Sequence, residues 1–175
     1  MRERQLARTD SLTGLYARRA FEERLRHDLA LGKRRRSAIS LAYLDLDDFK
    51  AVNDTHGHAE GDQALQTVGR ILRTAVREAD TAARLGGDEF AVLLPDTDRL
   101  GAEQLMTKLE HDLGKALEAW QITCSIGVTT FVEPAVSATA AVAAADMLMY
   151  EVKRQGKNAV AYRVIEGTIS PPARK

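Results

Sequence analysis

The fold is decided by the stretch Thr81-Ala82-Ala83-Arg84-Leu85-Gly86-Gly87-Asp88-Glu89-Phe90-Ala91-Val92-Leu93-Leu94. Its segments 81–85 and 89–94 are short apolar runs typical of strands, and the two glycines between them favour a tight turn, so the stretch predicts a β-hairpin. Because glycine has no side chain, a large anionic ligand could approach the backbone of this turn closely. Asp88 and Glu89 supply hard oxygen ligands suited to Mg²⁺ or Mn²⁺. An ordinary hairpin turn with polar residues would have the same local pattern.

A second acidic cluster follows the apolar segment 38–46, which we predict to be a buried strand. The cluster comprises Asp45, Asp47 and Asp48, and Asp45 falls where the strand is expected to give way to a loop. Ligands of α/β proteins bind at the carboxyl ends of strands, and strand alternation puts Asp45 and Asp47 on one face. A solvated acidic turn is the alternative. Taken together, the two acidic strand-edge clusters predict a shared metal site around a phosphoryl centre.

The rest of the chain alternates between helical and strand-like patterns. We predict helices over 17–31, 64–76, 100–117 and 138–154, a turn over 10–15, and further strands over 121–132 and 159–164; Gly32 is the expected end of the first helix. Helices alternating with strands around one hairpin predict the α/β class, with a mixed central β-sheet surrounded by helices. We expect one domain over 10–165, a linker or helix end over 1–9, and a tail over 166–175.

Composition argues against several classes of function. The 25 basic and 25 acidic residues give a net charge of zero, so nothing calls for a nucleic acid or a membrane surface as partner. No apolar stretch approaches the roughly 18 residues needed to span a bilayer, and the charged start has no apolar signal core. The single cysteine, Cys124, excludes an intrachain disulfide and is compatible with the cytoplasmic location that we expect. The sequence also lacks a phosphate loop, a dinucleotide fingerprint and zinc-type spacing.

Five spaced motifs resemble those of the GGDEF domains of diguanylate cyclases, over the chain from about Asp10 to Val164. In order they are Asp10-x-Leu12-Thr13-Gly14-Leu15 with Arg18-Arg19; Asp45-Leu46-Asp47-x-Phe49-Lys50-x-Val52-Asn53-Asp54 with Gly57-His58-x-x-Gly61-Asp62; Gly86-Gly87-Asp88-Glu89-Phe90; Ser125-Ile126-Gly127-Val128; and Ala145-Asp146-x-x-x-Tyr150-x-x-Lys153-x-x-Gly156-Lys157-Asn158. One such motif would be weak, but five in the family's order are specific. The resemblance implies a nucleotidyl-cyclase-like fold with a ferredoxin-like core. It also implies an enzyme of bacterial second-messenger signalling that condenses two GTP molecules into cyclic di-GMP and releases two pyrophosphates.

The resemblance assigns the metal chemistry residue by residue. Asp45 and Asp88 would be side-chain ligands of Mg²⁺ or Mn²⁺, two ions per half-site, and the Leu46 carbonyl would be a backbone ligand. Glu89 would lie beside the metals and the attacking ribose hydroxyl, where it could bind metal or help to deprotonate that hydroxyl. Asp45, Asp88 and Glu89 are therefore the catalytic candidates.

The resemblance also implies contacts to substrate and product. The substrate contacts would be Asn53 and Asp62 at the guanine edge, Lys153 and Lys157 at the triphosphate with backbone amides around Asp48, Phe49 and Lys50, and Arg84 at the turn or the phosphates. Arg77 and Asp80 match an Arg-x-x-Asp pattern that implies an inhibitory site for the product, cyclic di-GMP. Because one half-site cannot close the product ring, catalysis implies a homodimer, and an upstream sensor or regulatory domain is expected.

Three positions depart from the family pattern, and three other functions compete with the cyclase. Ala17 stands where Asn is usual, His56 where an aromatic residue is common, and Lys157 where Arg is usual, which turns a bidentate phosphate contact into a point charge. A non-catalytic receptor for cyclic di-GMP or GTP would normally have lost an acid or glycine of the signature turn. A cyclase making an adenine-containing dinucleotide conflicts with Asp62, and the density of motifs disfavours a plain structural domain.

Overall fold

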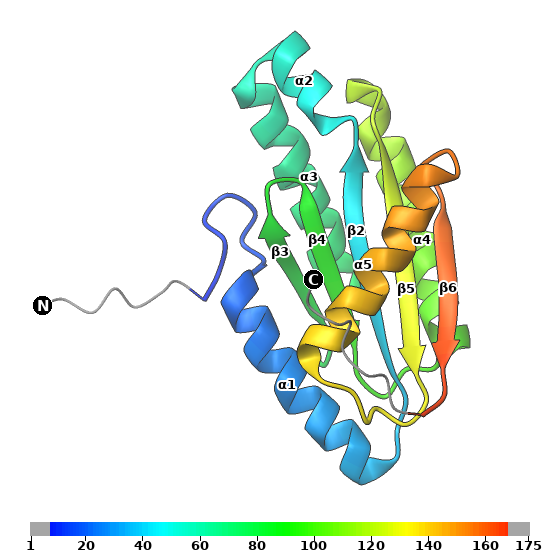
Figure 1. Ribbon diagram of the computed structural model, residues 1–175. Helices are drawn as coiled ribbons and strands as arrows, with labels where there is room; N and C mark the ends of the chain where they lie inside the picture. Colours follow the sequence, from blue (N-terminus) through cyan, green and yellow to red (C-terminus); the bar gives the residue numbers. More distant parts are fainter. Residues whose placement is uncertain (1–7, 168–175) are drawn as a thin grey trace, which may run out of the picture.

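The computed structural model describes residues 8–167, which form one mixed six-stranded sheet with helices on both faces (Figure 1). The strands are β1 (Tyr16–Ala17), β2 (Ile39–Asp47), β3 (Thr81–Gly86), β4 (Glu89–Leu94), β5 (Thr123–Phe131) and β6 (Val160–Ile165). The helices are α1 (Arg18–Arg35), α2 (Phe49–His56), α3 (His58–Ala75), α4 (Arg99–Leu117) and α5 (Ala138–Arg154), with a 3-10 turn at Glu118–Trp120. The predicted α/β class with a mixed central sheet is confirmed. The predicted linker over 1–9 and tail over 166–175 lie largely outside the described residues.

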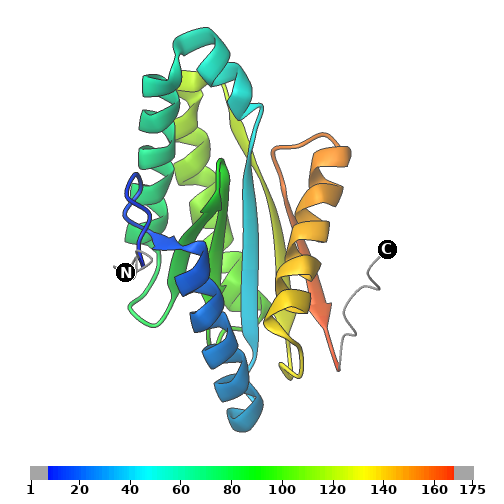
Figure 2. The same cartoon turned by 60° about the vertical axis from the view of Figure 1, so that its left-hand side comes forward.

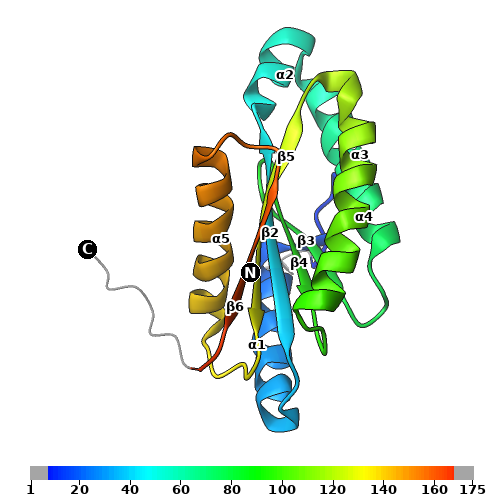
Figure 3. The same ribbon diagram turned by 90° about the vertical axis from the view of Figure 1, so that its right-hand side faces the viewer.

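The sheet has the strand order β1-β3-β4-β2-β5-β6. Its central strands β3, β4, β2 and β5 pair antiparallel, whereas β1 runs parallel to β3 and β6 parallel to β5. Helices α1 and α5 cover one face and α3 and α4 the other, so two apolar layers enclose the sheet (Figures 2 and 3). Because β2 lies between both layers, it is buried on both faces and is mostly apolar, as its sequence predicts.

The predicted hairpin is confirmed, but the first helix does not end at Gly32. It continues to Arg35, and Arg36 takes a left-handed conformation (φ 53°) in which its N–H donates to the Gly32 carbonyl. The basic residues of the last turn favour this extension because the carbonyl end of a helix is partly negative. Gly32 has a packing role instead: a Cβ there would lie 2.9 Å from Pro134 Cγ, so glycine allows α1 to approach the 134–138 segment.

The strand was expected to give way to a loop at Asp45, and this prediction is wrong, because β2 continues to Asp47. Helix α2 starts at Phe49, and α3 starts at His58 rather than at residue 64. The chain turns between the two helices at Gly57, whose φ of 87° is accessible to glycine at little cost. Val52 is the buried residue of α2, so this short helix has no apolar periodicity that would reveal it in the sequence.

Helix α5 lies directly on β5 because Gly127 has no side chain. A Cβ at this position would overlap the main chain of α5 and come within 2.9 Å of the Leu148 carbonyl carbon. The start of α5 is fixed by Ser137, whose side chain accepts a hydrogen bond from the Ala140 N–H. This close packing near the middle of α5, together with the cap at its start, sets where its last turn, which carries Lys153, reaches the sheet.

Candidate active site at the carboxyl end of β2

Three acidic side chains come together where β2 meets the β3–β4 turn. Asp45 of β2 lies directly opposite Glu89 of β4, and the Leu46 N–H donates to the Asp88 carbonyl over 3.2 Å. Directly opposed residues of an antiparallel pair point to the same face of the sheet, so the Asp45 and Glu89 carboxylates share the face covered by α1 and α5. The structure thus brings together the two acidic clusters that the sequence analysis connected.

The charge of this site is only partly compensated by Lys153 and by Arg18, whose Nη2 lies 3.9 Å from Glu89 Oε2. Burial raises the pKa of Asp45 to about 6; the nearby charges of Asp88 and Glu89 act in the same direction, while Lys153 opposes them. Asp146 of α5 also has a raised pKa, first through burial and then through Glu89. Crowded carboxylates whose ionisation is disfavoured favour binding of a cation, because the cation removes the repulsion.

The donor set fits a divalent metal that is completed by a substrate. Within residues 8–167, no group of three or more Asp, Glu, His or Cys side chains is arranged to hold a metal by itself. Mg²⁺ is usually held by one or two carboxylates together with water and substrate phosphates rather than by an all-protein cage. Asp45, Asp88 and the Leu46 carbonyl match that hard-oxygen chemistry.

Asp47, which the sequence pattern grouped with Asp45 and Asp48 in an acidic cluster, is held firmly by four donors of the protein. Its side chain is 1% exposed and accepts hydrogen bonds from Thr123 Oγ1 (2.6 Å), Ser125 Oγ (2.7 Å), Lys153 Nζ (3.1 Å) and the Asn158 N–H (3.2 Å). Burial alone would raise the pKa of Asp47, but these hydrogen bonds outweigh it and hold the pKa below its usual value. The signal in the sequence was an acid placed on the buried face of a strand, where a carboxylate requires donors.

Lys153, in the last turn of α5, and Lys157, three residues after the helix ends, reach the acidic end of β2. Lys153 Nζ lies 3.1 Å from Asp45 Oδ1 and 3.4 Å from the Leu46 carbonyl oxygen, in addition to its contact with Asp47. Lys157 Nζ lies 2.8 Å from Asp48 Oδ1. Beside these ammonium groups, α2 begins at Phe49, and the first N–H groups of a helix have no intrahelical acceptor and favour anions.

The predicted guanine contacts lie on the α2–α3 pair at the same end of the sheet. Asn53 is half-buried in α2, and Asp62 is exposed in the first turns of α3. Gly61 holds the two helices together, because a Cβ there would overlap the Asn53 side chain and lie 3.2 Å from Phe49 Cζ. The position of Asn53 therefore depends on the absence of a side chain at residue 61.

Arg84 forms hydrogen bonds to the β3–β4 turn and to the N-terminal segment. Its Nε and Nη2 donate to the Gly87 carbonyl over 3.0 and 2.8 Å, and its Nη1 donates to Asp10 Oδ1 over 3.2 Å. Asp10 in turn accepts from the N–H and the hydroxyl of Thr13, which fixes the predicted 10–15 turn. Of the two roles expected for Arg84, these contacts match support of the turn.

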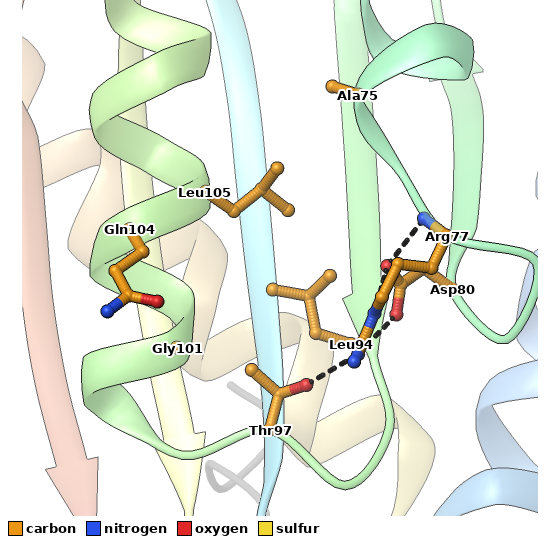
Figure 4. A pocket seen from close by; sticks show the side chains of 8 residues that line it. All are labelled: Ala75, Arg77, Asp80, Leu94, Thr97, Gly101, Gln104 and Leu105. Carbon is orange, nitrogen blue, oxygen red and sulfur yellow. Dashed lines mark hydrogen bonds and ion pairs between the residues drawn. The ribbon is translucent and has the colours of Figure 1, made fainter.

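Arg77 and Asp80 lie at the other end of the β3–β4 hairpin, roughly 20 Å away along a six-residue strand. Arg77 Nη2 lies 3.0 Å from Asp80 Oδ1 and 3.0 Å from Thr97 Oγ1, and Arg77 Nε lies 3.2 Å from Asp80 Oδ2 (Figure 4). The Asp80 carboxylate is buried, whereas the Arg77 side chain is 64% exposed beside a pocket that reaches Gly101 and Gln104 of α4. A buried acid that aligns an exposed guanidinium leaves N–H groups available to an anionic ligand.

These features define an α/β domain that presents an acidic, metal-compatible site and two converging lysines at one end of a mixed antiparallel sheet. The family model described as "Diguanylate cyclase, GGDEF domain" matches residues 7–159, and the chain belongs to this family. No helix in the described part of the chain is long and apolar enough to cross a membrane.

Relatives and solved structures agree with this assignment. The chain is 41% identical to the diguanylate cyclase DgcP of Pseudomonas aeruginosa, over 89% of this chain and 24% of that protein. It is 36% identical to the cyclic di-GMP phosphodiesterase PdeR of Escherichia coli, over 89% of this chain and 24% of that protein, so it spans about a quarter of the length of either relative. The GGDEF domain of DgcB from Caulobacter crescentus, solved in complex with c-di-GMP, superposes with a TM-score of 0.81 at 30% identity and covers 93% of this chain and 96% of that one.

Proposed function

We propose that this domain is a diguanylate cyclase that condenses two GTP molecules into cyclic di-GMP. The observation that supports this most directly is that Asp45 and Glu89 lie opposite each other on one face of the sheet, with Asp88 of the adjoining turn and Lys153 nearby. Carboxylates from neighbouring strands that could hold metal, next to ammonium groups that could hold phosphate, are the requirements of phosphoryl transfer.

In this proposal each group of the protein has a limited task. Bound Mg²⁺ or Mn²⁺, two ions per half-site, would lower the pKa of the ribose hydroxyl and neutralise phosphate charge. Asp45, Asp88 and the Leu46 carbonyl would hold the metals, and Glu89 would accept the hydroxyl proton or bind metal. Lys153 and Lys157, with the amides of residues 48–50, would hold the triphosphate.

Base recognition and support of the turn complete the assignment. Asn53 offers a donor and an acceptor to the guanine edge, while Asp62 accepts from the N1 and N2 donors of guanine. Arg84 would keep the Gly87 carbonyl, and with it the Asp88–Glu89 segment, in place. Two such domains would meet face to face as a homodimer, so that the 3′-hydroxyl of one GTP reaches the α-phosphorus of the other.

Product inhibition at Arg77 and Asp80 belongs to the same proposal. Asp80 holds the Arg77 guanidinium in a fixed plane, from which it could offer paired hydrogen bonds to a phosphate or to the Hoogsteen edge of guanine. The GGDEF domain of DgcB was solved in complex with c-di-GMP, which supports this ligand for the family. An upstream sensor domain and a cytoplasmic location remain parts of the proposal.

The alternative is a receptor domain that binds cyclic di-GMP without making it, since relatives such as PdeR carry the name of a phosphodiesterase. The complete set of acids in this chain favours the cyclase. The test is incubation of the purified protein with GTP and Mg²⁺ at low and high protein concentration, with chromatographic separation of products. The cyclase predicts cyclic di-GMP and pyrophosphate, a rate per chain that rises with concentration, and loss of product in Asp88→Asn but not in Asp112→Asn, an acid on α4 across the sheet. Binding of cyclic di-GMP with no turnover at any concentration would favour the receptor.

A further inference from the structure

Lys153 contacts the same oxygens that the proposed function gives to a metal ion. Its ammonium lies 3.1 Å from Asp45 Oδ1 and 3.4 Å from the Leu46 carbonyl oxygen, and both groups are candidate metal ligands. The side chains of Lys153 and Asp45 are 22% and 17% exposed, so the pair is largely shielded from water. The Lys153 ammonium is therefore a cation that already occupies two of the proposed metal ligands, Asp45 and the Leu46 carbonyl.

The two acids that hold Lys153 differ in how much they depend on it. Asp47 has three further donors in Thr123, Ser125 and the Asn158 N–H, so it is stable in its place with or without the lysine. Within the described residues, Lys153 is the ion-pair partner of Asp45, whose charge is otherwise disfavoured by Asp88 and Glu89. Asp47 is thus a fixed anchor, and Asp45 is the contact that can be exchanged.

We propose that Lys153 is an exchangeable counter-ion of the metal site. A divalent ion and the ammonium compete for Asp45 and the Leu46 carbonyl, because two cations at the same oxygens repel strongly in a shielded site. When the metal takes these oxygens, Lys153 stays anchored to Asp47 and its freed N–H groups face the phosphates. This inference rests on the proposed function. It means that metal binding and triphosphate binding are linked through Lys153, which Asp47 holds in place.

The coupling has a physical advantage for a site of this kind. Without Lys153, Asp45 and the Leu46 carbonyl would be open to a metal ion before a nucleotide arrived. With it, metal binding must break a charge-assisted contact, and that cost is recovered when the released ammonium meets the negative charge of a phosphate. Metal and triphosphate therefore bind cooperatively, each favouring the other by the same factor.

The first test measures Mn²⁺ binding by electron paramagnetic resonance in the absence of nucleotide. Lys153→Met is expected to bind Mn²⁺ roughly ten- to a hundredfold more tightly than the wild type, the equivalent of one charge-assisted hydrogen bond. Lys157→Met is the matched control, because it removes the same charge from the segment just after α5, where Lys157 contacts Asp48 instead of Asp45. It is expected to change the affinity by less than about threefold, as for an exposed pair.

Lys153→Arg serves as the rescue variant: it keeps the charge, and its Mn²⁺ affinity should stay within about threefold of the wild type. The competition is refuted if Lys153→Met binds Mn²⁺ no more tightly than Lys157→Met. A second measurement needs no substitution: the ¹⁵Nζ resonance of Lys153 in the wild-type protein should shift during a Mg²⁺ titration and saturate with the metal. An unchanged resonance would also overturn the inference.

These outcomes are separable from the proposed function. Neither measurement involves GTP, so a domain without cyclase activity can still show competition between Lys153 and the metal. Conversely, production of cyclic di-GMP together with an unchanged Mn²⁺ affinity in Lys153→Met would support the cyclase activity and refute the competition between Lys153 and the metal.

Discussion

Replacing Arg84 by Met should loosen the turn that carries Asp88 and Glu89. The Arg84 side chain is 16% exposed and donates to the Gly87 carbonyl and to both oxygens of Asp10. Methionine keeps the apolar stem but no donor. Since hydrogen bonds to charged groups contribute about 1.5–3 kcal/mol each and the Gly87 carbonyl can still bind water, we expect a loss of roughly 2–3 kcal/mol in the free energy of unfolding at neutral pH.

The assay is urea unfolding followed by circular dichroism, with Arg19→Met as the matched control. Arg19 pairs with Glu23, but the two side chains are 67% and 42% exposed, so its loss should cost less than about 0.5 kcal/mol. In a double-mutant cycle, Arg84→Met and Asp10→Asn should show a coupling of about 1–2 kcal/mol. A difference between Arg84→Met and Arg19→Met of less than 0.5 kcal/mol, or no coupling, would refute the reasoning.

The stabilisation that Arg84 provides should decrease in acid. Burial alone would raise the pKa of Asp10, but hydrogen bonds from Thr13 and the charge and hydrogen bond of Arg84 outweigh it and lower the pKa in the folded state. The resulting stabilisation is fully present above the pKa of the unfolded chain, about 4, and is lost as the pH falls through the folded value. The difference in stability between wild type and Arg84→Met should therefore shrink in acid. A difference that grows below about pH 4 would contradict this explanation.

The remaining predictions concern packing, charge and substrate binding. Gly127→Ala should lower the free energy of unfolding by about 3 kcal/mol because the added methyl meets the main chain of α5, whereas Gly114→Ala, which meets nothing within 4 Å on an exposed helix face, should raise it by roughly 0.5–1 kcal/mol in the same urea assay. Asp45→Asn should stabilise the protein in EDTA at pH 8 by roughly 1–3 kcal/mol, since the Asp45 pKa is raised to about 6. This gain should shrink as the pH falls from about 6 to the pKa of the unfolded chain, about 4, and an undiminished gain at pH 4 would contradict the origin in charge. Gly61→Ala displaces Asn53 and should raise the KM for GTP about tenfold with a smaller change in kcat. An unchanged KM would refute the proposed contact between Asn53 and GTP.

The hairpin, the class of fold and most helices follow from the sequence because they depend on near neighbours. Gly86-Gly87 between two apolar runs specifies a tight turn, and the spacing of Phe21 and Leu25 specifies a helix, whatever the rest of the chain does. The errors fall where tertiary contacts override local pattern. Gly32 has the residue type of a helix end but is required for packing against Pro134, and α2 has too little buried surface to show a period.

In the candidate site, too, the sequence indicates which residues matter, whereas only the tertiary structure shows how they contact one another. The sequence and its motifs determined which acids and lysines to consider, since residue type and order along the chain suffice for that. The tertiary structure alone decided that Asp47 is a buried anchor with four donors, that Arg84 is tied to Asp10, and that Lys153 contacts Asp45. Such contacts join segments far apart in the chain, and their distances are set by how helices pack on the sheet, which no local pattern encodes.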